Sequence, residues 1–153
     1  MIARRQFLVA GAALPWLLAG CGRHGEWPEG MAPIVWDRDT CVRCKMVISD
    51  RRFAAQVRGG PQNAAFRFDD VGCAVFWMRD HAIDMPWLAE AGTRFWVADA
   101  GSRPEQVRWL EPRAAQYVTR SSPMGYNFAA VAQPQAGSVD FATMREHVLA
   151  KGK

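Results

Sequence analysis

The chain has 153 residues, of which 50% are hydrophobic and 22% are charged, and its formal net charge is +4. A chain of this size buries a real hydrophobic core as one domain and does not need disulfide staples. Loss of the first twenty residues would remove two arginines and no acidic residue, so nineteen basic residues become seventeen against fifteen acidic ones, and the net charge falls to +2. A charge this small and scattered argues against a nucleic-acid-binding protein.

The first twenty residues have the pattern of an export signal. Arg4 and Arg5 stand just before Phe7-Leu8, which is typical of a twin-arginine signal. The apolar run 9–18 is shorter than the roughly 20 residues that a membrane-spanning helix needs. It ends on Leu18-Ala19-Gly20-Cys21, which resembles a bacterial lipobox. We therefore expect cleavage before Cys21 and lipid attachment to its sulfur, with an uncleaved anchor or an ordinary secretory signal as the alternatives.

These features predict a signal peptide at 1–20, a lipidated tether at 21–33 and one domain at 34–153. The tether contains Gly, Pro, His and Glu with little periodicity, as in a linker. Gly22, not aspartate, follows Cys21, so nothing signals retention at the inner membrane. We expect a membrane-anchored lipoprotein that faces the periplasm, with the outer membrane favoured over the inner one.

The domain shows alternating strand and helix signals. Two apolar segments flank a Gly-Gly-Pro turn, which predicts a hairpin of strands 53–57 and 64–68. Asp69 and Asp70 then supply an N-cap for a helix that ends near His81. Further strands are expected at 94–98, 107–110, 114–119 and 126–132, and a last helix at 141–151 with Asp140 as its cap. Because strand, strand, helix occurs twice and the turns are short, we expect one α+β domain with antiparallel pairing.

The cysteine count suggests that at least one thiol has a function. Lipid attachment at Cys21 leaves Cys41, Cys44 and Cys73. Three thiols cannot all pair within the chain, and a free thiol in an oxidising compartment is rarely idle. Cys73 falls in the first turn of the predicted helix, where the helix dipole favours a thiolate. The alternative is that Cys73 is a small buried helix residue that faces the core.

The segment Cys41-Val-Arg-Cys44-Lys-Met46 is compatible with three functions. A redox dithiol normally stands at a helix N-terminus, but no apolar helical period follows Cys44. A zinc site needs a tetrahedral set of ligands, which Cys73 and a histidine would have to complete. A Cu(I) site uses thiolates and thioethers, and Met46 would add such a sulfur unless it is a core residue. The spacing alone leaves these three functions open.

The position of a second methionine, Met124, also bears on the choice between a ligand and a core residue. Met124 stands in Ser122-Pro123-Met124-Gly125. The proline and the glycine fix and bend the backbone around it, so a methionine at the tip of this turn is poorly placed to fill the core.

Taken in order, three motifs resemble the NosL family of lipoprotein copper chaperones. They are Cys41-Val-Arg-Cys44-Lys-Met46, Phe68-Asp-Asp-Val-Gly-Cys73 and Ser122-Pro123-Met124-Gly125. The resemblance covers nearly all of the chain after Cys21 and implies two similar strand-strand-helix modules related to a domain of organomercurial lyase. It also implies Cu(I) ligands at Cys41, Cys44, Met46 and Met124, with Cys73 as a possible further ligand. Lys45 stands where the family usually has glycine, which places a positive charge beside the site.

The resemblance implies a metallochaperone and not an enzyme. Such a protein binds Cu(I) and delivers it for assembly of the copper centres of nitrous oxide reductase, the last enzyme of denitrification. The implied partners are apo nitrous oxide reductase, a copper-related membrane transporter complex and, through the lipid anchor, the membrane. Because transfer requires accessible donors, we expect residues 41–46 to form an exposed, flexible loop. The alternatives are a membrane-tethered thiol–disulfide oxidoreductase and a lipoprotein with a structural disulfide or zinc clip.

Overall fold

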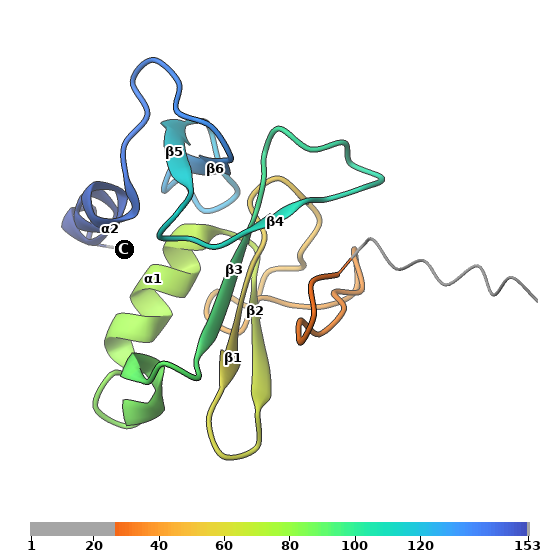
Figure 1. Ribbon diagram of the computed structural model, residues 1–153, viewed down its shortest axis with the longest axis vertical. Helices are drawn as coiled ribbons and strands as arrows, with labels where there is room; N and C mark the ends of the chain where they lie inside the picture. The colour runs from red at the N-terminus through yellow and green to blue at the C-terminus, as the bar shows by residue number, and fades with distance from the viewer. Residues whose placement is uncertain (1–26, 153) are drawn as a thin grey trace, which may run out of the picture.

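The structure, a computed structural model, describes residues 27–152 (Figure 1). The predicted signal peptide and Cys21 lie outside the described residues. Within 27–152, no helix is long and apolar enough to cross a membrane. The described elements combine antiparallel sheets with two α-helices, so the predicted α+β class is confirmed.

The first half of the domain is built on a four-stranded antiparallel sheet. Its central strand β1 pairs with β2 on one side and with β3 on the other, and β3 pairs with the short β4. The order across the sheet is therefore β2-β1-β3-β4 (Figure 1). The strands are β1 (Ala55–Gly59), β2 (Ala64–Phe68), β3 (Arg94–Ala98) and β4 (Trp109–Leu110).

The hairpin forms as predicted, but β1 begins and ends two residues later than expected. Gly59 was predicted to open the turn, yet it pairs with Ala64 as the last residue of the strand. The indole of Trp87 packs directly on Gly59, where a Cβ atom would lie 2.8 Å from the ring. Gly60 and Asn63 instead supply the positive φ angles of the turn, 76° and 49°. Gly59 is therefore required by packing and not by the turn.

The second half repeats the order strand, strand, helix. Strands β5 (Gln116–Thr119) and β6 (Phe128–Val131) form an antiparallel two-stranded sheet, and α2 (Phe141–Ala150) follows. In the first half, α1 (Val71–Asp80) follows β1 and β2, and the short 3-10 helix η1 (Pro86–Ala89) leads into β3. Helix α1 packs against β1, β2 and α2 (Figure 1).

Both α-helices begin at the predicted caps. The Asp70 carboxylate accepts a hydrogen bond from the Gly72 N–H at 2.8 Å, and the Asp140 carboxylate accepts one from the Thr143 N–H at 2.8 Å. Each bond satisfies a backbone donor that the first helical turn leaves without a partner. Asp70 therefore fixes the position of the first turn of α1, which carries Cys73.

One hydrophobic core joins the two halves of the domain. Phe68 and Phe76 from the first half and Tyr117, Tyr126 and Met144 from the second half are fully buried within it. The Ala100 N–H also donates to the Ala130 carbonyl at 2.8 Å, which connects the two sheets. Cys41 and Cys73 belong to the same core. The packing of the two halves therefore determines where these thiols lie.

Candidate metal centre

Three thiols and one carboxylate converge at the N-terminus of α1. The Sγ atoms of Cys41, Cys44 and Cys73 and a carboxylate oxygen of Asp69 all lie within 4.8 Å of one another. Cys41, Cys73 and Asp69 are buried, whereas Cys44 is half-buried. We call these four side chains the cysteine cluster. It joins the predicted motif of Cys41 and Cys44 to Cys73, which the sequence left between a ligand and a core residue.

A tight turn positions Cys41 and Cys44. The Lys45 N–H donates to the Cys41 carbonyl at 3.0 Å, and the Cys41 N–H donates to the Met46 carbonyl at 2.8 Å. The Val42 N–H donates to the Arg67 carbonyl at 2.9 Å and so attaches the turn to β2. Lys45 has a φ of 66°, in the left-handed region that favours glycine. The turn needs this conformation, and a glycine at this position would adopt it without strain.

The expectation of an exposed loop at residues 41–46 is wrong for one of its two thiols, Cys41. Cys41 and Cys73 are 0% exposed, and Cys44 alone among the three is partly exposed. Burial follows from the turn itself, because its hydrogen bonds direct Cys41 toward the first turn of α1. A metal held by the three sulfurs would be approached from the side of Cys44.

Asp69 was missed by the sequence analysis, which assigned it with Asp70 to the helix cap. One carboxylate is enough for the cap, and the structure uses Asp70. Asp69 accepts a hydrogen bond from the Cys44 thiol through Oδ1 at 3.2 Å, while its buried Oδ2 has no hydrogen-bond partner among the described residues. A buried carboxylate oxygen without a partner is costly. A cation in the cluster would remove that cost.

The cluster stabilises one thiolate at Cys41. Its pKa is lowered from 9.0 to about 4, chiefly because the Cys73 thiol donates a hydrogen bond to its sulfur. Burial opposes this shift, while the backbone N–H groups of Cys44 and Asp69 and the Cys44 thiol reinforce it. Donors that converge on one sulfur favour its charged form. Cys41 is therefore the thiol of the cluster that ionises most readily.

The other members of the cluster keep their protons more tightly. The pKa of Cys73 is raised because it donates to Cys41 and is buried. Burial raises the pKa of Cys44 to about 12, and burial followed by the charge of Cys41 raises that of Asp69 to about 6. Among the three thiols, negative charge is thus confined mainly to Cys41 when no metal is bound. Metal ligation by all three sulfurs would release the thiol protons of Cys44 and Cys73.

The two predicted thioether ligands lie in different settings. Met46 is 51% exposed, and the adjacent Val47 is 46% exposed. Met46 is therefore not the core residue that was its alternative. Met124 is half-buried against the main core, and its N–H donates to Asp70 Oδ2 at 3.3 Å. The assignment of either methionine as a copper ligand stays a prediction.

The loop that carries Met124 is bonded at two points to residues that neighbour the cysteine cluster. The Ser122 hydroxyl donates to Asp70 Oδ2 at 2.6 Å, and Arg43, which lies between the two cysteines of the turn, donates to the Tyr126 hydroxyl at 2.8 Å. Tyr126 also packs directly on Gly72, where a Cβ atom would lie 2.2 Å from its ring. The second half of the domain therefore contacts both segments that supply thiols.

No protein-family model and no curated protein matches the sequence. Among solved structures, the crystal structure of the copper chaperone NosL from Shewanella denitrificans is similar, with a TM-score of 0.50. The alignment covers 78% of this chain and 88% of that chain at 14% sequence identity. The chain has the fold of NosL. At this identity the likeness establishes the fold, and the conclusion about metal binding depends on the cysteine cluster itself.

Proposed function

We propose that this chain is a metallochaperone that binds one Cu(I) ion in the cysteine cluster and delivers it to an apo-enzyme. The convergence of three thiols beside a buried carboxylate oxygen without a partner is the observation that carries the proposal. Thiolate sulfur is the donor that favours Cu(I). The solved structure of similar fold is described as a copper chaperone, which supports copper as the cargo.

Each member of the cluster has a distinct role in this proposal. The Cys41 thiolate receives Cu(I), and Cys73 adds a second buried sulfur. Cys44 is the thiol that solvent reaches, so an incoming ligand from a partner would displace Cys44 first. Met46 stands exposed two residues further on and supplies a thioether for entry or release. Met124 would add sulfur from the second half of the domain.

The cellular setting follows from the sequence patterns. Lipid attachment at Cys21 places the protein on a membrane facing the periplasm, with the outer membrane favoured. The recipient is apo nitrous oxide reductase, whose copper centres the chaperone helps to assemble, and a copper-related membrane transporter complex is a further partner. The two strand-strand-helix modules are related to a domain of organomercurial lyase, but the role here is binding and transfer without catalysis.

A structural zinc site is the second candidate. Three thiols and one carboxylate form a complete tetrahedral donor set for Zn²⁺. A thiol–disulfide oxidoreductase has less support, because such an enzyme attacks its substrate with an accessible thiolate. Here the thiolate is favoured at Cys41, which is fully buried, while the accessible Cys44 has a raised pKa.

An anaerobic titration of the reduced mature protein against a Cu(I) indicator tests the proposal. We expect about one equivalent of Cu(I), weaker binding in Met46→Leu and Met124→Leu, and unchanged binding in the control Met85→Leu. If both Met46→Leu and Met124→Leu retain full affinity, the thioether ligands are wrong. Zinc that resists displacement by Cu(I) would favour the structural site. Insulin reduction that is lost in Cys41→Ser would favour the oxidoreductase.

Delivery needs its own experiment. Cu(I)-loaded protein is mixed anaerobically with apo nitrous oxide reductase, and the copper content of each is measured after separation. We expect copper to move to the reductase faster than from an indicator complex that buffers the same free Cu(I) concentration. Equal rates from the two donors would contradict a chaperone role while leaving Cu(I) binding intact.

A further inference from the structure

Three tryptophans form a stack where the described chain begins. The ring centroids of Trp27 and Trp36 are 6.0 Å apart, those of Trp27 and Trp109 are 5.6 Å apart, and those of Trp36 and Trp109 are 6.4 Å apart. All three are only partly buried. The stack combines segments from the start of the domain and from β4. Because indole rings prefer positions with one apolar side and one hydrated side, such a stack is suited to an interface.

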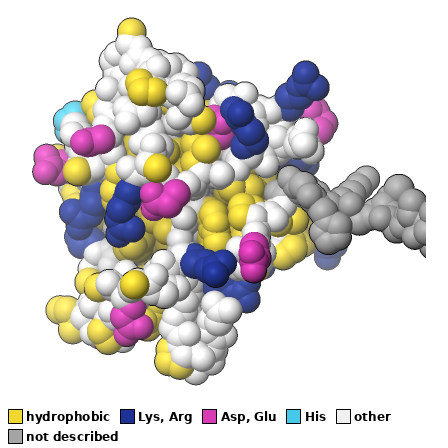
Figure 2. All heavy atoms as spheres, in the orientation of Figure 1, with side chains coloured by type: hydrophobic (Ala, Val, Ile, Leu, Met, Phe, Trp, Pro, Cys, Tyr) yellow, Lys and Arg dark blue, Asp and Glu magenta, His cyan; other side chains and the backbone are white. Residues whose placement is uncertain are grey.

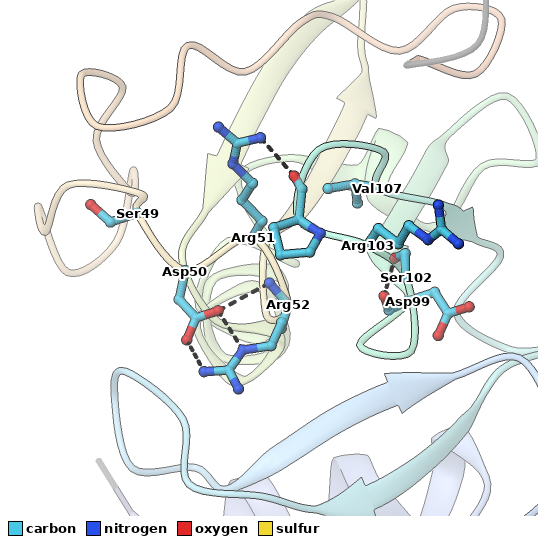
Figure 3. A pocket seen from close by; sticks show the side chains of 9 residues that line it. Ser49, Asp50, Arg51, Arg52, Asp99, Ser102, Arg103 and Val107 are labelled. Atoms are coloured by element: carbon cyan, nitrogen blue, oxygen red, sulfur yellow. Dashed lines mark hydrogen bonds and ion pairs between the residues drawn. The ribbon is translucent and has the colours of Figure 1, made fainter.

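Arginines surround this stack. The Arg51 guanidinium lies 5.1 Å from the centre of the Trp36 ring and donates to the Pro104 carbonyl at 2.7 Å. Arg51 and Arg103 line a pocket of about 440 Å³ (Figure 3), and Arg108 lines an adjacent groove of about 370 Å³ together with Trp27 and Trp109. We call the six residues Trp27, Trp36, Trp109, Arg51, Arg103 and Arg108 the tryptophan–arginine face.

The charges on this face are only partly neutralised. In the pocket, Asp50 pairs with Arg52, and the buried Asp99 pairs with Arg108. Arg51 and Arg103 form no ion pair with any residue in 27–152. Guanidinium groups bind phosphate oxygens with matching geometry. Figure 2 shows hydrophobic side chains gathered near the start of the described chain, with Lys and Arg side chains around them.

A hydrogen-bonded strap fixes the start of the chain on the domain. Residues 29–33 run along the four-stranded sheet, and arginines from three of its strands donate to their carbonyl groups. The Gln56 side chain also exchanges two hydrogen bonds with the Ala32 backbone, at 2.8 and 2.7 Å. The arginine bonds are Arg94 to Glu29 at 2.9 Å, Arg58 to Gly30 at 2.6 Å and Arg67 to Pro33 at 3.0 Å. Trp27 therefore stands next to a firmly held segment.

The short segment between Cys21 and Trp27 limits how far the tryptophan–arginine face can lie from a lipid on Cys21. Trp27 is the sixth residue after Cys21, so six residue steps join them. Even fully extended, they span at most about 21 Å. If Cys21 carries lipid, as in the proposed function, the tryptophan–arginine face stays close to the bilayer. Tryptophan is enriched at the membrane–water interface, and arginine is attracted to anionic headgroups.

We propose that the tryptophan–arginine face docks on the surface of an anionic phospholipid bilayer. The tryptophans contact the headgroup and upper acyl region, and Arg51 and Arg103 face the phosphates. The lipid anchor and the docked face together hold the domain in one orientation on the membrane. This inference depends on lipid attachment at Cys21 but not on which metal the cysteine cluster binds.

Fluorescence quenching by brominated lipid tests the docking. The lipidated mature protein is inserted into phosphatidylcholine vesicles with and without phosphatidylglycerol, and brominated chains report which tryptophans reach the bilayer. We expect stronger quenching with phosphatidylglycerol. Replacing Trp27, Trp36 and Trp109 together by phenylalanine should remove most of it. The control Trp87→Phe, which alters a half-buried ring packed on the β1–β2 hairpin, should leave it unchanged.

Charge reversal supplies the second arm of the test. Arg51→Glu with Arg103→Glu should abolish the effect of phosphatidylglycerol, whereas the control Arg145→Glu on α2 should not. Quenching that persists in the triple phenylalanine variant, or that Trp87→Phe removes, would overturn the proposal. So would quenching that is the same with and without phosphatidylglycerol. Each variant is also titrated with Cu(I), and unchanged affinity separates a failure of docking from a failure of metal binding.

Discussion

The two loops that carry the predicted copper ligands are built in different ways. The Cys41–Met46 turn places one thiol in the core, leaves another half-buried and exposes its methionine. The loop 122–126 contributes no thiol, and its hydrogen bonds to Asp70 and Arg43 hold a half-buried methionine beside the first site. Both loops have a backbone hydrogen bond of their own, Lys45 N–H to the Cys41 carbonyl and Gly125 N–H to the Ser122 carbonyl, each at 3.0 Å. The second loop is in addition fastened to the other half of the domain by side-chain bonds.

In the proposed function, the buried residues hold the metal and the exposed residues exchange it with a partner. The buried Cys73 keeps its proton and donates it in a hydrogen bond to Cys41, which stabilises the Cys41 thiolate before any metal arrives. Cys44 and Met46 stand at the edge, where a partner can reach them. The loop with Met124 can then change the affinity of the site without being needed to form it. Five variants, in four experiments, test how the two loops and the cluster contribute, in order of expected effect.

The largest effect is expected when a buried thiol is removed. Cys73→Ser should lower Cu(I) affinity by about 100-fold or more, because it removes a sulfur ligand, while the serine hydroxyl can still donate a hydrogen bond to the Cys41 thiolate. Met124→Leu should lower the affinity by about 10-fold at most. Competition with a Cu(I) indicator measures both. Equal losses in the two variants would remove the distinction between the loops.

The contact between α1 and the loop 122–126 is tested at Gly72. A Cβ atom there would overlap the Tyr126 ring, so Gly72→Ala should lower the free energy of unfolding by about 3 kcal/mol. Gly92→Ala is the matched control, because nothing lies within 4 Å of the Cβ that it adds. Denaturant unfolding of the metal-free proteins measures the change. If Gly72→Ala is as mild as Gly92→Ala, Tyr126 does not pack on the helix as described.

Asp69 should destabilise the metal-free protein at neutral pH. Its pKa is raised from 3.8 to about 6, so the contribution of its protonated form is complete below pH 3.8 and is lost as the pH rises through about 6. Asp69→Asn should therefore raise the free energy of unfolding at pH 7.5 by about 2 kcal/mol and change little at pH 4. The same variant should be stabilised less by Cu(I). A variant less stable than the parent at pH 7.5 would show that Asp69 has a structural role instead.

The smallest effect is expected at Lys45. Lys45→Gly should raise the free energy of unfolding by about 1 kcal/mol, because it removes a side chain from a residue with a φ of 66°. It would also remove the bond from Lys45 Nζ to the Val42 carbonyl at 2.7 Å, which offsets part of the gain. Thermal unfolding measures the difference. A clear loss of stability would mean that this bond outweighs the backbone strain.

Local signals predicted the elements better than they predicted the contacts between them. The caps Asp70 and Asp140 and the strands 64–68 and 94–98 could be read directly, because capping and alternation depend on neighbouring residues. The end of β1 was missed because Trp87, far along the chain, decides the role of Gly59. No local pattern reports such a contact.

The same limit applies to the cysteine cluster. The spacing of Cys41 and Cys44 indicates a shared centre, but only the packing of the turn against α1 brings Cys73 to it. Asp69 was assigned to the cap because two adjacent acidic residues before a helix look alike in sequence. Which of them caps the helix and which faces the thiols depends on the position of the turn, and that position is set by tertiary contacts.

X-ray absorption of the Cu(I)-loaded protein tests the central claim most directly, because it counts the sulfur atoms around the metal. Comparing the parent with Cys73→Ser isolates the contribution of the thiol on α1. We predict that the parent has one more sulfur neighbour than Cys73→Ser, with Met85→Leu identical to the parent. Identical copper spectra for the parent and Cys73→Ser would show that the metal binds without the α1 thiol, and would contradict a site built by all three cysteines.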